Sequence, residues 1–377
     1  METVLSVENL SKTFTVRQKL PGFLPSVRAL FRPQRKEVRA VDGITFSVER
    51  GEMLAFIGPN GAGKSTTIKL VTGILYPTAG SIRVLGLDPH RQRKDLARRI
   101  GTVFGQRSQL WYHLPPLDTM LLLADIYDLD RTKARARIDF LVEAFGIRDY
   151  LRTPVRKLSL GERVRCEIAA SLLHSPEVLF LDEPTIGLDV IVKASIRDLI
   201  RRMNEEERTT VFLTSHDTGD IEKICRRAIV INHGSIVWDG TIKDMKYRLL
   251  RRKVIDLKLD APLRLEAAGV EVLKSRPYSA KLAVDLAAAS LDEVVSLIMR
   301  DNHVEDITIS NPPMEEIITR IYAWARTPRG GGAMGSRHAA RGCRPRDGGS
   351  RQGTSGGAAD VAAPASPEGA DGAGGPP

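Results

Sequence analysis

The glycine-rich stretch at residues 58–66, GPNGAGKST, holds the residues best suited to chemistry in this 377-residue chain. It matches the pattern G-x-x-x-x-G-K-[ST], in which backbone N–H groups surround a polyphosphate that a Cβ would otherwise obstruct. In this pattern the lysine contacts the β and γ phosphates, and the hydroxyl that follows it can hold Mg²⁺. The pattern therefore predicts a phosphate-binding loop, whose candidate residues are Gly58, Asn60, Gly61, Gly63, Lys64, Ser65 and Thr66.

Two adjacent acids, Asp182 and Glu183, follow an apolar run at residues 178–181. If this run is a strand of a parallel sheet, Asp182 lies at its carboxyl end beside the phosphate loop, where it can organise water around Mg²⁺. Glu183 can then accept a proton from the water that attacks the γ-phosphate. A turn or a helix cap is the alternative for such a pair, but the phosphate loop upstream favours the catalytic interpretation.

Three single residues are further candidates. His216 ends a strand-like run in register with the two acids and could reach a γ-phosphate, although a single histidine is more often structural. Gln106 directly follows the predicted strand at residues 100–104. Phe14 lies upstream of the phosphate loop, where an aromatic ring can stack on adenine or simply pack at the end of a strand.

A second helix start lies at residues 158–162, LSLGE. Ser159 and Glu162 have the spacing of a capping box, in which each satisfies a backbone N–H group of the other. Taken alone, this spacing explains both residues without any ligand.

The elements that must position these residues can also be predicted. The apolar run at 53–57 is typical of a buried parallel strand, and a helix is expected to begin at Lys64. Strand-like and helical runs alternate through residues 1–250, with a helical insert at 106–165, so the fold class expected is α/β with a mostly parallel sheet. Residues 2–14 are expected to form an edge strand. An insertion at 15–39, rich in base and proline, favours a solvated hairpin over a membrane-surface segment.

Two further parts follow the first 250 residues. Alternating apolar residues and helical spacing at 254–325 predict a small α+β C-terminal domain without a catalytic constellation, for which a regulatory or docking role is the modest inference. From residue 327 to residue 377 large apolar side chains are almost absent, and glycine, alanine and proline dominate. Such a tail cannot bury enough surface to offset its ordering entropy and is expected to be disordered.

Composition limits the function classes. A formal charge of +10 is consistent with an acidic partner surface, either a membrane leaflet or nucleic acid. Three cysteines without C-x-x-C spacing argue against a disulfide framework and a zinc site, and favour a reducing cytoplasm. The chain has no run of 18 apolar residues and no pattern of a signal peptide, so it is not expected to cross a bilayer itself.

Taken in order, these motifs resemble the nucleotide-binding subunits of ABC transporters, and most closely the bacterial ABC-2 export group of sodium-exporter-like and drug-exporter-like subunits. The resemblance covers about two thirds of the chain. It implies a P-loop NTPase cassette at 1–250 that binds ATP with Mg²⁺. It also implies roles for single residues: Gln106 joins the metal, held by Ser65 and Asp182, to the membrane-subunit interface; Glu183 is the catalytic base, His216 the switch histidine, Asp189 the D-loop acid and Phe14 the adenine-stacking aromatic.

The resemblance also replaces the capping-box interpretation of the second helix start. In this family that helix end binds the γ-phosphate held by a second subunit, through positions matching Ser159 and Gly161, and a helix N-terminus is well suited to an anion. The chain departs from the pattern at three positions, where Leu160 replaces a glycine, Glu162 a glutamine and Ile186 a serine. These changes bear on the turnover rate.

The function expected is that of an ATPase subunit at the cytoplasmic face of a bacterial membrane. Two copies, or one copy and a homologue, would dock on separate integral membrane permease subunits and close on ATP to drive export. A soluble ABC ATPase acting on ribosomes or nucleic acid would suit the basic charge, but such proteins resemble tandem cassettes or cassettes split by a long coiled coil. Nucleic acid is therefore not the expected partner. A non-catalytic protein on the same scaffold would be expected to lack Glu183 or His216.

Overall fold

The computed structural model describes residues 2–17, 35–105, 108–215, 218–249, 252–312 and 314–325. Two predicted site residues, Gln106 and His216, lie outside the described residues. So do residues 18–34 of the predicted insertion and the whole of the predicted disordered tail.

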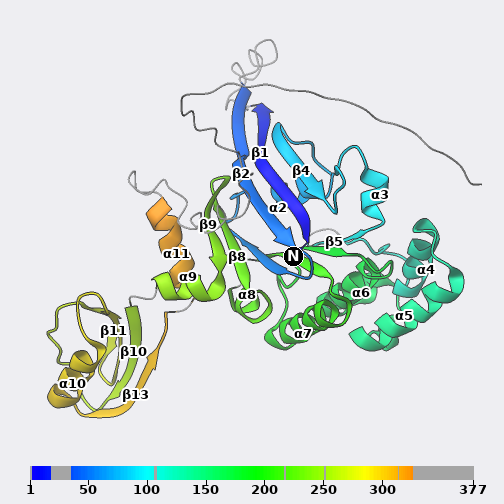
Figure 1. Cartoon of the computed structure of the whole chain (residues 1–377). Helices are drawn as coiled ribbons and strands as arrows, with labels where there is room; N and C mark the ends of the chain where they lie inside the picture. The colour runs from blue at the N-terminus through cyan, green and yellow to red at the C-terminus, as the bar shows by residue number, and fades with distance from the viewer. Residues whose placement is uncertain are drawn as a thin grey trace, which may run out of the picture. The chain divides into compact units, whose positions relative to one another are not determined.

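A six-stranded sheet with the strand order β5-β6-β7-β3-β8-β9 forms the centre of the fold (Figure 1). The first five strands of this order are parallel, and β9 is antiparallel to β8. All residues of β3 and β7 are buried, as expected for parallel strands covered on both faces. The strands are β3 (Met53–Ile57), β5 (Ile100–Phe104), β6 (Val178–Asp182), β7 (Thr210–Ser215), β8 (Arg227–Asn232) and β9 (Ser235–Thr241). The α/β class with a mostly parallel sheet is confirmed.

A three-stranded antiparallel sheet with the order β2-β1-β4 covers part of this core. Its strands are β1 (Thr3–Arg17), β2 (Arg35–Glu49) and β4 (Ala79–Val84). The prediction that residues 2–14 form an edge strand is wrong, because β1 pairs with β2 on one side and β4 on the other. The β1–β2 ladder also continues to the pair Arg17↔Arg35, so the strands extend into both ends of the predicted insertion.

Helices and apolar side chains cover the central sheet. On one side Phe56 and Phe212 of neighbouring strands contact Phe46 of β2 and each other, and Phe180 contacts Phe212, with tilted rings whose centroids are 5.3 to 6.2 Å apart. On the other side, helices pack on alternate residues of the same strands. Helices α7 (Val190–Glu207), α8 (Thr218–Ile224) and α9 (Ile242–Leu249) lie on this second side, whereas α2 (Lys64–Val71) and α3 (Arg93–Ala97) pack on the side of the phenylalanines.

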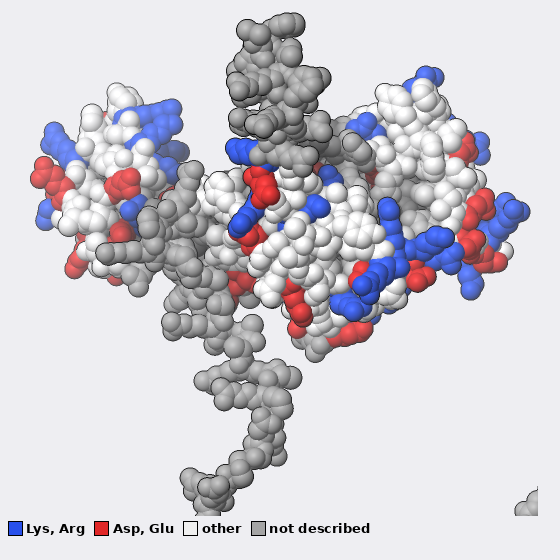
Figure 2. All heavy atoms as spheres, turned by 90° about the horizontal axis from the view of Figure 1, so that it is seen from above, with Lys and Arg blue, Asp and Glu red and all other residues white. Residues whose placement is uncertain are grey.

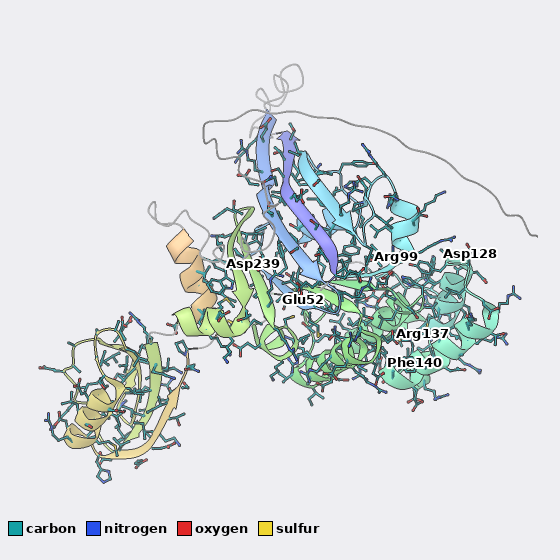
Figure 3. All side chains as sticks on the ribbon, in the orientation of Figure 1. Glu52, Arg99, Asp128, Arg137, Phe140 and Asp239 are labelled. Atoms are coloured by element: carbon teal, nitrogen blue, oxygen red, sulfur yellow. The ribbon has the colours of Figure 1, made fainter. Side chains whose placement is uncertain are left out.

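The predicted helical insert is present between β5 and β6. Its elements are α4 (Pro116–Ile126), α5 (Arg131–Phe145), the short 3-10 helices η1 (Arg148–Tyr150) and η2 (Val155–Lys157), and α6 (Leu160–Ser171). Asp130 caps α5 by accepting a hydrogen bond from the Lys133 N–H. Arg137 of α5 forms an ion pair with Glu207 at the end of α7, and this pair ties the insert to the rest of the fold. The Arg137 guanidinium also lies over the ring of Phe140 in the same helix (Figure 3).

The C-terminal part contains a four-stranded antiparallel sheet with the order β11-β12-β10-β13 and its own apolar core. Its elements are β10 (Arg252–Leu259), β11 (Val270–Arg276), β12 (Ser279–Asp285), α10 (Leu291–Asp301) and β13 (Val304–Ser310). The last described helix, α11 (Met314–Ala325), does not share that core. The sequence pattern predicts this helix as part of the small domain. Its apolar side chains pack instead with α8, α9, β8 and β9 (Figure 1).

No helix among the described residues is both long and apolar enough to span a membrane.

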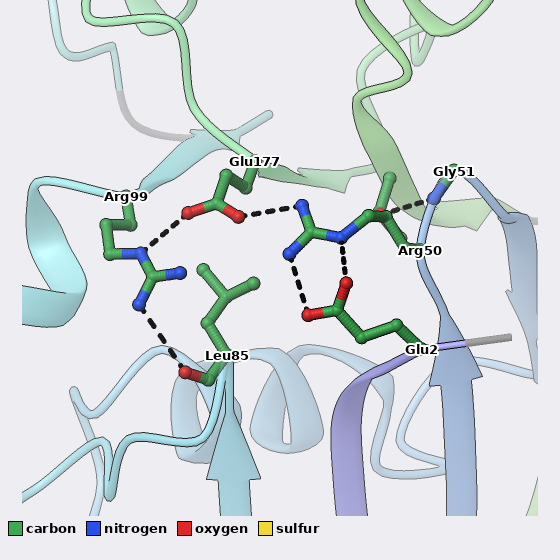
Figure 4. A network of polar contacts seen from close by, with 7 residues as sticks. Glu2, Arg50, Gly51, Leu85, Arg99 and Glu177 are labelled. Atoms are coloured by element: carbon green, nitrogen blue, oxygen red, sulfur yellow. Dashed lines mark hydrogen bonds and ion pairs between the residues drawn. The ribbon is translucent and has the colours of Figure 1, made fainter.

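An ion-pair network joins the two sheets near the start of the chain (Figure 4). Arg50 contacts Glu2 at 2.7 Å and Glu177 at 2.7 Å, and Arg99 contacts the other oxygen of Glu177 at 2.6 Å. Glu2 precedes β1, whereas Glu177 precedes β6, so the network connects the antiparallel sheet to the central one. The hydrogen bond from Arg99, with further help from Arg50, lowers the pKa of the Glu177 carboxyl below its ordinary value of 4.5.

We expect Glu177→Gln to lower the free energy of unfolding by about 1–2 kcal/mol at pH 7, since two charge-assisted hydrogen bonds to a partly buried carboxylate are weakened. Because the pKa of Glu177 is lowered in the folded protein, its contribution is complete above the ordinary value of 4.5 and is lost as pH falls through the folded value. The difference between wild type and variant should therefore be constant from neutral pH to about pH 5 and shrink below it. Urea denaturation across pH measures it.

Glu2→Gln provides the matched control, because Glu2 contacts the same arginine but is largely exposed. It should cause a smaller loss of stability than Glu177→Gln. Equal losses, or a Glu177→Gln effect that does not depend on pH, would contradict the assignment.

Candidate functional site

The glycine-rich loop lies between the end of β3 and the start of α2, where the sequence predicts it. Gly63 immediately precedes α2 with φ +111°, a conformation that residues with a Cβ rarely adopt. A Cβ on Gly63 would lie 2.4 Å from the Ala40 carbonyl oxygen of β2. The Ala62 N–H donates to the Pro59 carbonyl and closes the turn, while Asn60 and Gly61 remain exposed. The loop is thus pressed against β2 on one side and open on the other.

Lys64 begins α2 and is 5% exposed. Its ammonium group donates to the Gly58 carbonyl at 2.7 Å and to the Pro59 carbonyl at 3.4 Å, and lies 3.4 Å from Glu183 Oε1. These oxygens stabilise a charge that burial alone would penalise strongly. Ser65, the next residue, is exposed in the first turn of α2. The structure therefore brings the phosphate-loop lysine and the predicted catalytic base together.

The two acids lie at the carboxyl end of β6, as expected. Asp182 is the last residue of the strand, and its Oδ1 accepts a hydrogen bond of 2.6 Å from the hydroxyl of Thr214, its partner on β7. Glu183 has φ +53°, an uncommon conformation for a residue with a side chain, and its N–H donates to both oxygens of Thr214 at 3.1 Å. Thr214 therefore orients both acids.

Sequence reasoning did not identify Thr214. Its position could have indicated it, because Thr214 lies near the end of the strand-like run that leads to His216, and this run was predicted to be in register with the two acids.

The capping box at the second helix start, which the resemblance replaced with a phosphate-binding role, is present in the structure. Ser159 Oγ accepts from the Glu162 N–H at 3.3 Å, and Glu162 Oε2 accepts from the Ser159 N–H at 2.8 Å. Gly161 lies against α7, because a Cβ there would be 2.9 Å from a methyl group of Val192. The close approach of α6 and α7 explains why a glycine is needed at this position.

A cavity of about 330 Å³ opens where α6 and α7 begin. It brings together Ser159, Gly161 and Asp189, three of the predicted site residues, but its lining includes neither Lys64 nor the two acids. Asp189 caps α7 by accepting hydrogen bonds from the N–H groups of Ile191 and Val192. Arg165 also lines the cavity, and its Nε is buried without a hydrogen-bond partner among the described residues. The site residues thus form two groups in the single chain.

Phe14 lies on β1, half-buried, opposite Val38 of β2. The ammonium group of Lys12 lies 5.3 Å from the centroid of its ring. The ring is therefore at least partly accessible, and its stacking on adenine stays a prediction.

Residues 41–186 match the family model described as ABC transporter. The chain is similar to the ABC transporter ATP-binding protein NatA of Bacillus subtilis, with 32% identity over 57% of this chain and 87% of that protein. It is also similar to the daunorubicin/doxorubicin resistance ATP-binding protein DrrA of Streptomyces peucetius, with 35% identity over 75% of this chain and 88% of that protein.

Solved structures give the same fold. One is that of cbiO1 from Clostridium perfringens, described as part of the ABC transporter complex cbiONQ, with a TM-score of 0.54, 28% identity and coverage of 65% of this chain and 90% of that chain. Another is the dimeric, post-hydrolysis structure of the cassette MJ0796 bound to ADP and Pi, with a TM-score of 0.53, 23% identity and coverage of 63% and 98%.

We expect Gly63→Ala to lower the free energy of unfolding by about 2–4 kcal/mol, because an alanine is strained at φ +111° and its methyl group would collide with the Ala40 carbonyl. Gly61→Ala is the matched control. Gly61 also has a positive φ, +80°, but a Cβ there would meet nothing within 4 Å, so a loss of only about 1 kcal/mol is expected. Chemical denaturation of both variants measures the difference. Equal losses would show that the contact with β2 does not constrain the loop.

Proposed function

The chain belongs to the family of ABC transporter ATP-binding proteins, as an ATP-hydrolysing subunit of an exporter, and we propose which of its residues bind ATP and which hydrolyse it. The observation that carries the proposal is the 3.4 Å distance between Lys64 Nζ and Glu183 Oε1. It places an ammonium group that can contact the terminal phosphates beside a carboxylate that can take a proton from water. Both groups can therefore act on one γ-phosphate.

In the proposed reaction the loop at 58–66 and the first turn of α2 surround the phosphates of ATP with N–H groups. Lys64 leaves the Gly58 and Pro59 carbonyls and the Glu183 carboxylate to contact the β and γ phosphates. Glu183 can then accept a proton from the attacking water, and His216 helps to position that water. The hydrogen bond that the Glu183 N–H donates to the Thr214 hydroxyl supports this role, because it holds the Glu183 backbone in place while the partner of its side chain changes.

Magnesium fits the donors at this site, because the Ser65 hydroxyl and the Asp182 carboxylate are the hard oxygen ligands that this ion prefers. We propose that these two residues hold Mg²⁺ together with Gln106. The ion would offset the charge that develops on the phosphates during transfer.

A second cassette is proposed to complete the site. Ser159 and Gly161 lie at the N-terminus of α6 and line a cavity together with Asp189 and Arg165, whose Nε is buried without a hydrogen-bond partner among the described residues. This chemistry suits a phosphate, yet Lys64 and Glu183 of the same chain do not line the cavity. A γ-phosphate held by a second copy, or by a homologue, would satisfy it. ATP would then close the two cassettes, and hydrolysis would release them.

The partners proposed are integral membrane permease subunits of ABC-2 type, with the chain at the cytoplasmic face of a bacterial membrane. Among relatives, NatA and DrrA are named as ATP-binding proteins of a transporter and of drug resistance, and cbiO1 is part of a transporter complex. We propose that the cassette at 1–250 binds and hydrolyses ATP and that the small sheet within 254–325 has a regulatory or docking role.

A nucleic-acid or ribosome partner is less well supported. The chain's relatives NatA and DrrA are named as ATP-binding proteins of a transporter and of drug resistance. On the face that Figure 2 shows, basic side chains gather in a band with acidic side chains beside it, so charge on this face does not by itself identify a nucleic-acid surface.

Glu183→Gln should retain ATP binding and lower hydrolysis by a factor of about 100 or more, since the amide keeps the shape of the side chain but cannot accept the proton. Steady-state phosphate release and a binding titration with a fluorescent ATP analogue measure the two effects on the full chain. Lys64→Ala is the companion variant and should lose binding itself. Full hydrolysis by Glu183→Gln, or wild-type affinity in Lys64→Ala, would overturn the roles assigned.

Glu162→Gln should favour the ATP-closed dimer. The amide oxygen can still accept the hydrogen bond from the Ser159 N–H, but the negative charge near the proposed phosphate position is removed. In the Glu183→Gln background, where ATP is not consumed, the ATP concentration that gives half dimer should fall about tenfold, as expected from removing a like-charge repulsion of about 1.4 kcal/mol. Analytical ultracentrifugation measures it.

Glu162→Ala separates charge from capping. It removes the same charge and also the acceptor for the Ser159 N–H, and should cost about 1 kcal/mol of stability that Glu162→Gln does not. No gain of dimer with Glu162→Gln would mean that its charge does not face a bound phosphate.

A further inference from the structure

Four large apolar side chains are exposed around the starts of α6 and α7. Their exposed fractions are 38% for Leu160, 40% for Ile186, 78% for Val190 and 82% for Ile191. A single exposed apolar residue is ordinary on a protein surface, whereas several together mark an interaction surface. We call these four residues the apolar rim; none of the roles proposed for the site uses them.

The apolar rim borders the cavity at the start of α6. Leu160 itself lines the cavity, and so do Gly187 and Asp189, which lie between Ile186 and Val190 in the sequence. A Cβ on Gly187 would lie 3.3 Å from a methyl group of Leu160, so the α6 and α7 parts of the rim are neighbours. The rim and the cavity are therefore continuous.

The geometry of α7 keeps its part of the rim exposed. Val192 is turned toward α6, because a Cβ on Gly161 would lie 2.9 Å from one of its methyl groups. Successive residues of a helix point about 100° apart, so Val190 and Ile191 do not share this direction and remain in solvent. A partner that covers the cavity would also reach these two side chains.

The symmetry of the proposed dimer places this partner. Each α6 start must face the phosphate loop of the other copy, and two such contacts form together when a two-fold axis relates the copies. The axis then passes between the two groups of site residues in each chain. Residues 184–188 join these groups, because they run from Glu183 beside Lys64 to Asp189 at the cavity. This segment of one copy therefore meets the same segment of the other.

The composition of the rim suits a contact between identical surfaces. Residues 184–188, PTIGL, carry no charge, so two copies can approach without repulsion. Ile186 stands where the family pattern has a serine and Leu160 where it has a glycine, and both differences add apolar surface. In a two-fold contact each copy contributes the same patch. An apolar patch can meet itself, because it needs no donor opposite an acceptor.

We propose that the apolar rim is a contact between two copies of this chain, and that this contact holds part of the dimer together without nucleotide. The inference rests on the proposed function, which supplies the orientation of the two copies. The partner is a second copy and not a homologue with polar side chains at these positions, because only apolar surface gains by covering the rim. The contact also offsets the negative charge that Glu162 brings to the closed dimer.

Sedimentation velocity on the full chain without nucleotide tests the contact. Four side chains cover much less than the roughly 800 Å² per partner of a stable interface, so a weak dimer is expected, with a dissociation constant on the order of 100 μM. The double variant Ile186→Ser/Ile191→Ser should raise this constant about tenfold, since a two-fold contact loses each side chain twice. Raising NaCl from about 0.1 to 1 M should not weaken the wild-type dimer, because an apolar contact is not screened.

Ile309→Ser is the matched control. Ile309 on β13 is an isoleucine with nearly the same exposed fraction as Ile186, 43%, and it does not line the cavity. This variant should leave the dissociation constant unchanged. Thermal unfolding checks that the double variant folds, and Val190→Ser is a separate single variant that should weaken the dimer in the same direction.

The proposal is overturned if the wild-type chain stays monomeric without nucleotide at about 500 μM, well above the expected constant. It is also overturned if salt separates the wild-type dimer, or if Ile309→Ser weakens it as much as the double variant does. Should the double variant not fold, an unchanged dimer in Val190→Ser has the same meaning. The proposed function fails in a different measurement, namely when Glu183→Gln binds no ATP or forms no dimer with ATP. A chain that is monomeric alone but dimerises with ATP in the Glu183→Gln form therefore overturns the rim contact and leaves the proposed function standing.

Discussion

A buried ammonium group must have oxygen partners, and this requirement links the parts of the cassette. Lys64 is almost completely enclosed, so the loop carbonyls and the Glu183 carboxylate must stabilise its charge. Phosphate oxygens are chemically equivalent partners. The same enclosure that makes the lysine costly without partners therefore makes it an effective phosphate ligand, in surroundings where water competes less. Parallel strand order then brings Glu183 close, since β6 and β3 flank β7 and all three end at the same edge of the sheet.

The start of α6 can be capped within the chain and still bind an anion, because the two uses involve different N–H groups. The capping box satisfies the Ser159 and Glu162 N–H groups within the chain, so the helix is stable by itself. The N–H groups of Leu160 and Gly161 are left for another partner, and the cavity before them opens toward solvent. Capping and anion binding are therefore compatible here. The cost of the combination is electrostatic, because a Glu162 carboxylate brings negative charge to a position that would receive a phosphate.

Local patterns in the sequence predicted much of the site, because the chemistry of Lys64, Asp182 and Ser159 depends on neighbours within a few residues. The strand at Met53–Ile57 and the helix from Lys64 were predicted with their observed bounds. The pairing partners of the antiparallel strands were not predictable. The pairing of β1 with β4 joins Leu5 to Val84, and nothing near residue 5 shows it. For the same reason the apolar face of α11 predicted a helix but not the core in which it packs.

The geometry of Glu183 shows how the fold maintains an unfavourable local conformation. A positive φ at a residue with a side chain costs on the order of 1–2 kcal/mol, which an isolated strand end would relieve by turning the peptide. Here the Glu183 N–H is held by Thr214, the Asp182 carboxylate by the Thr214 hydroxyl, and the Asp182 carbonyl by Gly105. Three contacts from two flanking strands thus leave the peptide no freedom to turn. The strain directs the carboxylate toward Lys64, and a relaxed backbone would direct it elsewhere. The fold therefore keeps an unfavourable backbone conformation at a residue whose direction matters for chemistry.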